Sequence, residues 1–172
     1  HDAVTEAAVV LLGRAARYLP ADSAHVRRIV ERLLSALRTP SELVQEAVAS
    51  CLPALVRASA AAKDVPSIVD RLFVDLLHGD KYATRRGAAY GLAGVVKGRG
   101  VSAIRELRIL ARLSEAAHDT STTTTRQGAL FAYELLASTL HVLLEPYVDG
   151  ILADLLLCFG DTHADVREAT QD

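Results

Sequence analysis

The chain has 172 residues, of which 51% are hydrophobic, 23% are charged and 5% are aromatic, with no Trp and no Met. This composition excludes a disordered chain, and the net charge of −2 excludes a uniformly basic nucleic-acid-binding module. No stretch reaches the roughly 18 apolar residues of a membrane span, and no signal peptide is visible at the start. Both ends of the sequence cut through periodic segments, so we expect a soluble piece of a longer polypeptide.

Apolar residues recur at three- and four-residue spacings along the chain, which predicts amphipathic helices joined by short loops containing Pro, Gly and Asp. The segment Asp64-Val65-Pro66 is predicted to open a helix. Pro53 lies inside another predicted helix, where we expect either a kink or a later helix start. The predicted helices are 2–19, 23–38, 41–59, 65–78, 81–97, 101–118, 124–142, 146–159 and 163 to the end.

One short pattern returns five times: a small apolar residue or Thr, two polar residues, then Ala or Gly. The copies start at Val4, Val44, Thr84, Thr125 and Val166, which gives an even period of about 40 residues. Leu- and Ile-rich helices lie between them, so each unit is a helix pair. This period, together with the Val166-Arg167-Glu168-Ala169 segment after Asp161, is typical of HEAT repeats. We therefore predict an all-α, right-handed superhelical solenoid of about four helix pairs with partial repeats at both ends, as one unit over 1–172.

The predicted helix 81–97 is unusual because it contains three glycines, Gly87, Gly91 and Gly94, at spacings of four and three. Each glycine costs roughly 1 kcal/mol relative to Ala in a helix interior. The glycines share one face, so we predict that a neighbouring helix packs closely against it. A phosphate-binding loop is the alternative, but no strand precedes the segment and Lys97 is not followed by Ser or Thr.

Several blocks of the second half carry a more specific similarity. They are residues 86–98, 128–134, 145–148, 155–161 and 166–169, whereas residues 1–80 have only general HEAT character. In these blocks the chain resembles the general control non-derepressible activator family, very large HEAT-repeat proteins that activate the kinase of translation initiation factor two alpha. It is similar to the middle of those proteins, near the part resembling fungal elongation factor three. The Ser/Thr-rich segment 121–125 departs from the family, which tends to have a basic loop there.

The resemblance implies a function in translational control. It implies a cytoplasmic, non-catalytic scaffold that binds ribosomes, through ribosomal RNA or ribosomal proteins, and relays amino-acid starvation or ribosome stalling to the kinase. The kinase and other translation factors are implied to bind regions outside this chain. No cofactor, small-molecule substrate or membrane partner is implied.

Few residues have the type and spacing that would predict a catalytic, cofactor or metal site. No pair among the six histidines has a metal-ligand spacing with a Cys or carboxylate, and Cys51 and Cys158 lie in apolar stretches, which predicts buried, reduced thiols. We therefore expect no catalytic, cofactor or metal site.

Basic residues concentrate around the third repeat, and we predict that they contact ribosomal RNA phosphates or an acidic ribosomal protein surface. The alternative is a solvated solenoid face with ion pairs within each repeat. A second basic set, Arg14, Arg17, Arg27 and Arg28, lies closer to acidic residues. The candidate contact residues are Lys81, Arg85, Arg86, Lys97, Arg99, Arg105 and Arg108.

Periodicity alone leaves other functions open. A nuclear-transport adaptor or a phosphatase scaffold subunit would share it. The HEAT part of an ATPase resembling elongation factor three is the enzymatic alternative, and it would need nucleotide-binding motifs outside this chain. A purely structural docking surface would be marked by an exposed apolar patch on the ridge between repeats.

Overall fold

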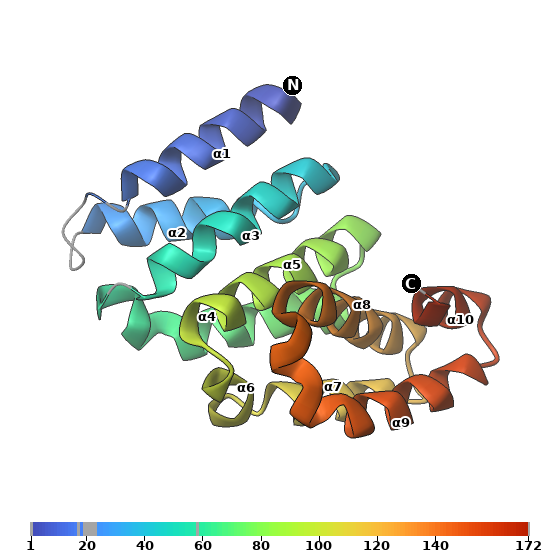
Figure 1. Cartoon of the computed structure of the whole chain (residues 1–172). Helices are drawn as coiled ribbons and strands as arrows, with labels where there is room; N and C mark the ends of the chain where they lie inside the picture. The colour runs from blue at the N-terminus through green and yellow to red at the C-terminus, as the bar shows by residue number, and fades with distance from the viewer. Residues whose placement is uncertain (1, 17, 19–23, 58, 172) are drawn as a thin grey trace.

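A computed structural model describes residues 2–16, 18, 24–57 and 59–171, and over these ranges the chain is helical without any strand (Figure 1). In chain order the elements are α1 (Asp2–Ala16), α2 (Ala24–Ala36), α3 (Glu42–Arg57), α4 (Ser59–His78), α5 (Tyr82–Arg99), α6 (Ser102–Glu106), α7 (Ile109–Ala117), α8 (Thr123–Leu140), the 3-10 helix η1 (His141–Tyr147), α9 (Val148–Phe159) and α10 (Ala164–Gln171).

The helices form two layers. In one layer α1 packs on α3, α3 on α5, α5 on α8 and α8 on α10, and all five carry the recurring small-residue pattern near their start. The Leu- and Ile-rich helices α2, α4, α7 and α9 form the other layer, each against the helix that follows it (Figure 1). One continuous core of buried side chains runs from Val9 to Ala169. The predicted all-α solenoid of helix pairs is confirmed.

The glycines of α5 lie where neighbouring helices come closest. A Cβ at Gly87 would lie 2.7 Å from the carbonyl carbon of Leu37, beyond the end of α2, and one at Gly94 would lie 2.7 Å from the Ala49 carbonyl oxygen on α3. At Gly91 a Cβ would meet side-chain atoms of Leu37 and Leu72 at 2.6 and 2.7 Å. The predicted close packing of this glycine face is therefore confirmed.

The α-helices α3 and α4 each run through a proline. α3 begins at Glu42 and continues past Pro53, so the expectation of a later start is wrong. α4 begins at Ser59 rather than at residue 65, and Pro66 lies in its interior. A proline removes one backbone hydrogen bond. Because Val65 and Ile68 on either side of Pro66 are buried in the core, their packing holds the helix together across that gap.

The predicted helix 101–118 is divided into α6 and α7. The division falls at Arg108, whose φ of 52° is left-handed. Ile104 and Ile109 are both buried, yet five residues on a continuous helix place two side chains about 140° apart around the axis. The break turns both side chains toward the core. At the next junction α8 ends at Leu140 and η1 precedes α9, which begins two residues later than expected.

No helix in the described ranges has the length and apolar character needed to cross a bilayer.

Candidate functional site

The structure separates the predicted basic residues into two groups at opposite ends of α5. Lys81 precedes the first residue of α5, whereas Lys97 and Arg99 lie in its last turn. Sixteen residues of helix between Lys81 and Lys97 correspond to about 24 Å. Arg105 and Arg108 follow on α6 and just after it, close to the last turn of α5 (Figure 1).

We call the group at the C-terminal end of α5 the basic end, and it includes one residue that sequence reasoning missed. Arg57, the last residue of α3, is exposed and its Nε donates to the Gly98 carbonyl oxygen at 3.1 Å. The repeat period would have found it, because Arg57 stands one repeat before Lys97. The basic end consists of the exposed residues Arg57, Lys97, Arg99, Arg105 and Arg108.

The basic end has little internal neutralisation. Arg108 forms an ion pair with Glu115 at 3.4 Å, but both side chains are about 70% exposed, so water screens the pair strongly. A second exposed carboxylate, Glu106, lies on α6, whereas Glu115 lies on α7. Five cations therefore face solvent beside two carboxylates.

Arg85 is not available to a partner. Its exposed fraction is 6%, and its guanidinium donates to the Gly79 carbonyl oxygen at 2.8 Å and to Gln127 Oε1 at 2.6 Å. Its buried Nε has no hydrogen-bond partner within the described part of the chain. Burial lowers the pKa of Arg85 because the charged form is desolvated. The prediction that Arg85 contacts a partner is corrected, since the side chain joins two repeats.

Arg86 is likewise held inside the solenoid. Its guanidinium forms hydrogen bonds and an ion pair with Glu134 on α8, and lies 3.6 Å from Glu42 on α3. It also stacks over the Phe131 ring at 5.4 Å from the centroid. The hydrogen bond to Glu134 raises the pKa of Arg86. Arg86 thus joins three neighbouring helices of three successive repeats, whereas the alternative expectation placed the ion pairs within a repeat.

Arg85 belongs to a set of side chains that occupy the same position in successive repeats. Each donates to a carbonyl oxygen in the loop before its own helix. Gln45 reaches Thr39 at 2.7 Å, Arg126 reaches Asp119 at 2.6 Å and Arg167 reaches Asp161 at 2.7 Å. The Arg of the Val-Arg pattern is therefore a structural residue that fastens the loop between the two helices of a repeat.

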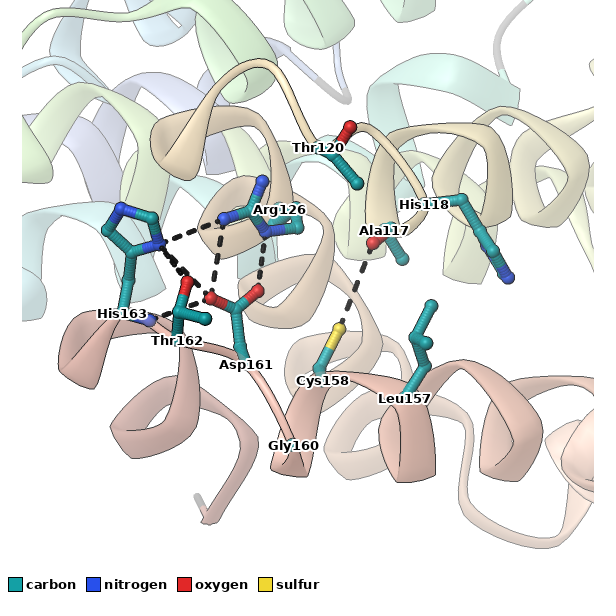
Figure 2. Close-up of a pocket in the computed structure, with 10 residues that line it drawn as sticks. All are labelled: Ala117, His118, Thr120, Arg126, Leu157, Cys158, Gly160, Asp161, Thr162 and His163. Atoms are coloured by element: carbon teal, nitrogen blue, oxygen red, sulfur yellow. Dashed lines mark hydrogen bonds and ion pairs between the residues drawn. The ribbon is translucent and has the colours of Figure 1, made fainter.

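A shallow pocket at this last loop is lined by several polar side chains, among them Arg126, Asp161 and His163 (Figure 2). Arg126 Nε donates to Asp161 Oδ2 at 2.7 Å, and the His163 backbone N–H donates to Asp161 Oδ1 at 2.8 Å. Burial opposes the charge of Asp161, but these hydrogen bonds outweigh it and hold the pKa of Asp161 below its ordinary value. The Arg126, Asp161 and His163 side chains of this pocket are thus hydrogen-bonded to one another.

Cys158 lines the same pocket, with its Sγ 4.0 Å from the Ala117 carbonyl oxygen (Figure 2). Burial raises the pKa of Cys158, so the thiol stays protonated and is a poor nucleophile. Cys51 is also buried and free. Within the described ranges, no group of three or more His, Cys, Asp or Glu side chains could hold a metal ion.

The relatives found by comparison with known proteins have related names. The chain is 48% identical over all 172 residues to the human protein named stalled ribosome sensor GCN1, and equally identical to the mouse protein of that name. It is 38% identical over 169 residues to the Saccharomyces cerevisiae protein named eIF-2-alpha kinase activator GCN1. The chain spans about 6% of the length of each of these relatives. No solved structure matches.

The relatives confirm the resemblance to the general control non-derepressible activator family, and they extend it to residues 1–80. The family described as EF3 N-terminal HEAT repeat matches residues 85–172, which is slightly more than half of the chain. The chain belongs to this HEAT-repeat family.

Proposed function

We propose that this chain is a non-catalytic part of a cytoplasmic, ribosome-associated scaffold that supports activation of the initiation factor two alpha kinase during amino-acid starvation or ribosome stalling. The names of the relatives and the identity over the whole chain support this proposal. The kinase and other translation factors bind other regions of the scaffold. The chain acts as a single solenoid unit over residues 1–172, without a small-molecule substrate.

The observation that carries the ribosome contact is the basic end. Long, exposed Lys and Arg side chains at the ends of α3 and α5 and on α6 suit ribosomal RNA phosphates, because each phosphate contact releases a condensed counterion. Lys81 lies at the other end of α5 and acts as a separate, weaker contact. Arg85 and Arg86 are not part of this contact, since their guanidinium groups are held inside the solenoid.

Co-sedimentation of the purified chain with ribosomes tests this contact. We expect binding to weaken on the order of 100-fold between 50 and 200 mM salt, as a few phosphate contacts require. Replacing Lys97, Arg99 and Arg105 together by Glu abolishes binding without loss of helical circular dichroism, because all three side chains are exposed.

The matched control replaces three exposed arginines far from the basic end, Arg14, Arg28 and Arg32, by Glu. It changes the net charge by the same amount and keeps most of the binding. Equal binding by the two triple variants would contradict the proposed contact, and loss of binding in both would show that only the net charge matters.

A further inference from the structure

A groove of about 360 Å³ crosses the layer of α3, α5 and α8. Its lining comes from all three helices: Glu46 and Ser50 from α3, Gly94 and Lys97 from α5, and Ser138 from α8. α5 has both of its layer neighbours in place here, so the opening is not left by a missing helix. By contrast, the opening beside Ile29 lies where a further helix pair would stack, because Ile68, its equivalent in the next repeat, is buried.

Small side chains form part of the groove lining, beside the larger Tyr90 and Leu135. Gly94 forms part of its floor because α5 and α3 approach closely there. Ala49, Ser50 and Ser138 lie on either side, and none of them is large enough to fill the space. A surface of this kind lets the backbone of another helix come close, as small residues do wherever helices pack tightly.

The two ends of the groove carry opposite charges without ion-pair partners. Glu46 and Lys97 are exposed, and neither forms a hydrogen bond or ion pair with another described residue. Glu46 lies at the level of Tyr90, whose hydroxyl donates to the neighbouring Glu42 at 2.8 Å. Lys97 lies seven residues beyond Tyr90, or about 10 Å along the axis of α5. His141, with a left-handed φ of 48°, stands exposed beside the Lys97 end.

We propose that this groove docks a helical segment of a partner protein, which places a basic side chain against Glu46 and an acidic side chain two turns away against Lys97. Two turns of helix span about 11 Å, which is close to the roughly 10 Å by which Lys97 lies beyond the level of Tyr90 along the axis of α5. A nucleic acid fits less well, because the unpaired carboxylate of Glu46 repels phosphates. The groove therefore suits a protein helix, whereas the basic end suits RNA phosphates, although Lys97 borders both surfaces.

Selection from a random library of 18-residue peptides displayed on phage tests the proposal with the wild-type chain as bait. We expect the recovered peptides to share a basic and an acidic residue seven positions apart, with small or apolar residues between them. Synthetic copies of these peptides lose at least tenfold in affinity for Glu46→Lys and for Lys97→Glu. Each loss is reversed by inverting the one peptide charge that faces the altered residue.

Lys63→Glu and Glu168→Lys, two exposed positions away from the groove, serve as controls and leave peptide affinity unchanged. Failure to recover such peptides, or equal affinity for the groove variants and the controls, overturns the proposal. Displacement of a bound peptide by a ten-residue oligouridylate would assign the groove to RNA instead. Glu46→Lys also separates this site from ribosome contact, since it abolishes peptide docking but adds a cation that favours ribosomal RNA.

Discussion

Gly128 on α8 offers a quantitative test of how closely successive repeats pack. A Cβ added there would lie 3.0 Å from the carbonyl carbon of Leu76, near the end of α4, and nearer still to its oxygen. The obstacle is backbone, so it cannot rotate away as a flexible side chain could. Gly128→Ala therefore forces α8 away from α4, and the contacts between the two helices loosen.

The magnitude follows from two opposing effects. Alanine is favoured over glycine in a helix interior by about 1 kcal/mol. Overpacking a well-packed interface costs about 1–3 kcal/mol, and a backbone obstacle places this substitution at the upper end of that range. We therefore expect Gly128→Ala to lower the free energy of unfolding by about 2 kcal/mol.

Urea denaturation followed by helical circular dichroism measures the change, with Gly150→Ala as the matched control. Gly150 also lies in a helix, but no atom lies within 4 Å of an added Cβ. The free energy of unfolding of the Gly150→Ala control should rise by roughly 0.5–1 kcal/mol, since only the helix propensity and the entropy of the unfolded chain change. A Gly128→Ala variant as stable as the wild-type chain would refute the argument that the recurring small residue is required by close packing.

Three further substitutions test other parts of the structure. Gly91→Leu should prevent folding, because four added carbons have no room between two core leucines; a melting temperature near that of the wild type would contradict this. Arg126→Ala should cost about 1.5–3 kcal/mol in urea denaturation because it removes a buried guanidinium and its charged hydrogen bonds to Asp161. Arg108→Ala, which breaks an exposed pair, should cost less than about 0.5 kcal/mol. Asp161→Asn should be less stable than the wild type at pH 7 and should lose less stability on acidification. The folded pKa of Asp161 is lowered, so the stabilisation by its carboxylate is present above about pH 4 and disappears below. Parallel pH profiles of stability for the two proteins would refute this.

The repeat itself could be predicted from sequence because its physical requirement is simple. Where the backbones of two helices approach closely, only Gly or Ala fits at the point of contact. Gly87 and Gly128 occupy such points at equivalent positions of successive repeats. The division between α6 and α7 could not be predicted from the three- and four-residue spacings. Leu107 and Leu110 continue the apolar pattern across the break, and only the burial of both Ile104 and Ile109 shows that the chain must turn there.

The candidate contact residues were the least predictable part. Sequence shows where a charge lies along the chain, but its availability depends on what the neighbouring repeat places opposite it. Gln127 bonds Arg85 from 42 positions away in sequence, and Glu134 bonds Arg86 from 48 positions away. At such sequence separations, counting charges along the chain does not show which cations are paired. For the same reason, a count of neighbouring charges does not find Arg57. It lies far from Lys97 in sequence but donates a hydrogen bond to the Gly98 carbonyl oxygen at the same end of α5.

The period nevertheless contains a criterion that separates structural from functional cations. Stacked repeats place equivalent residues in equivalent surroundings, so a side chain that fastens one repeat tends to return in the next. Arg85, Arg126 and Arg167 recur once in each successive repeat, and all three donate to loop carbonyl oxygens. Arg99 and Arg105 have no cation one repeat before or after them and remain exposed. Arg86 also lacks recurrence but is paired, and Arg57 and Lys97 recur one repeat apart yet are exposed, so recurrence has to be considered together with exposure. Arg99 and Arg105 are outside the period and exposed, and neither forms an ion pair with another described residue, unlike the exposed Arg27 and Arg38; this is the reason to look for their partner outside the solenoid.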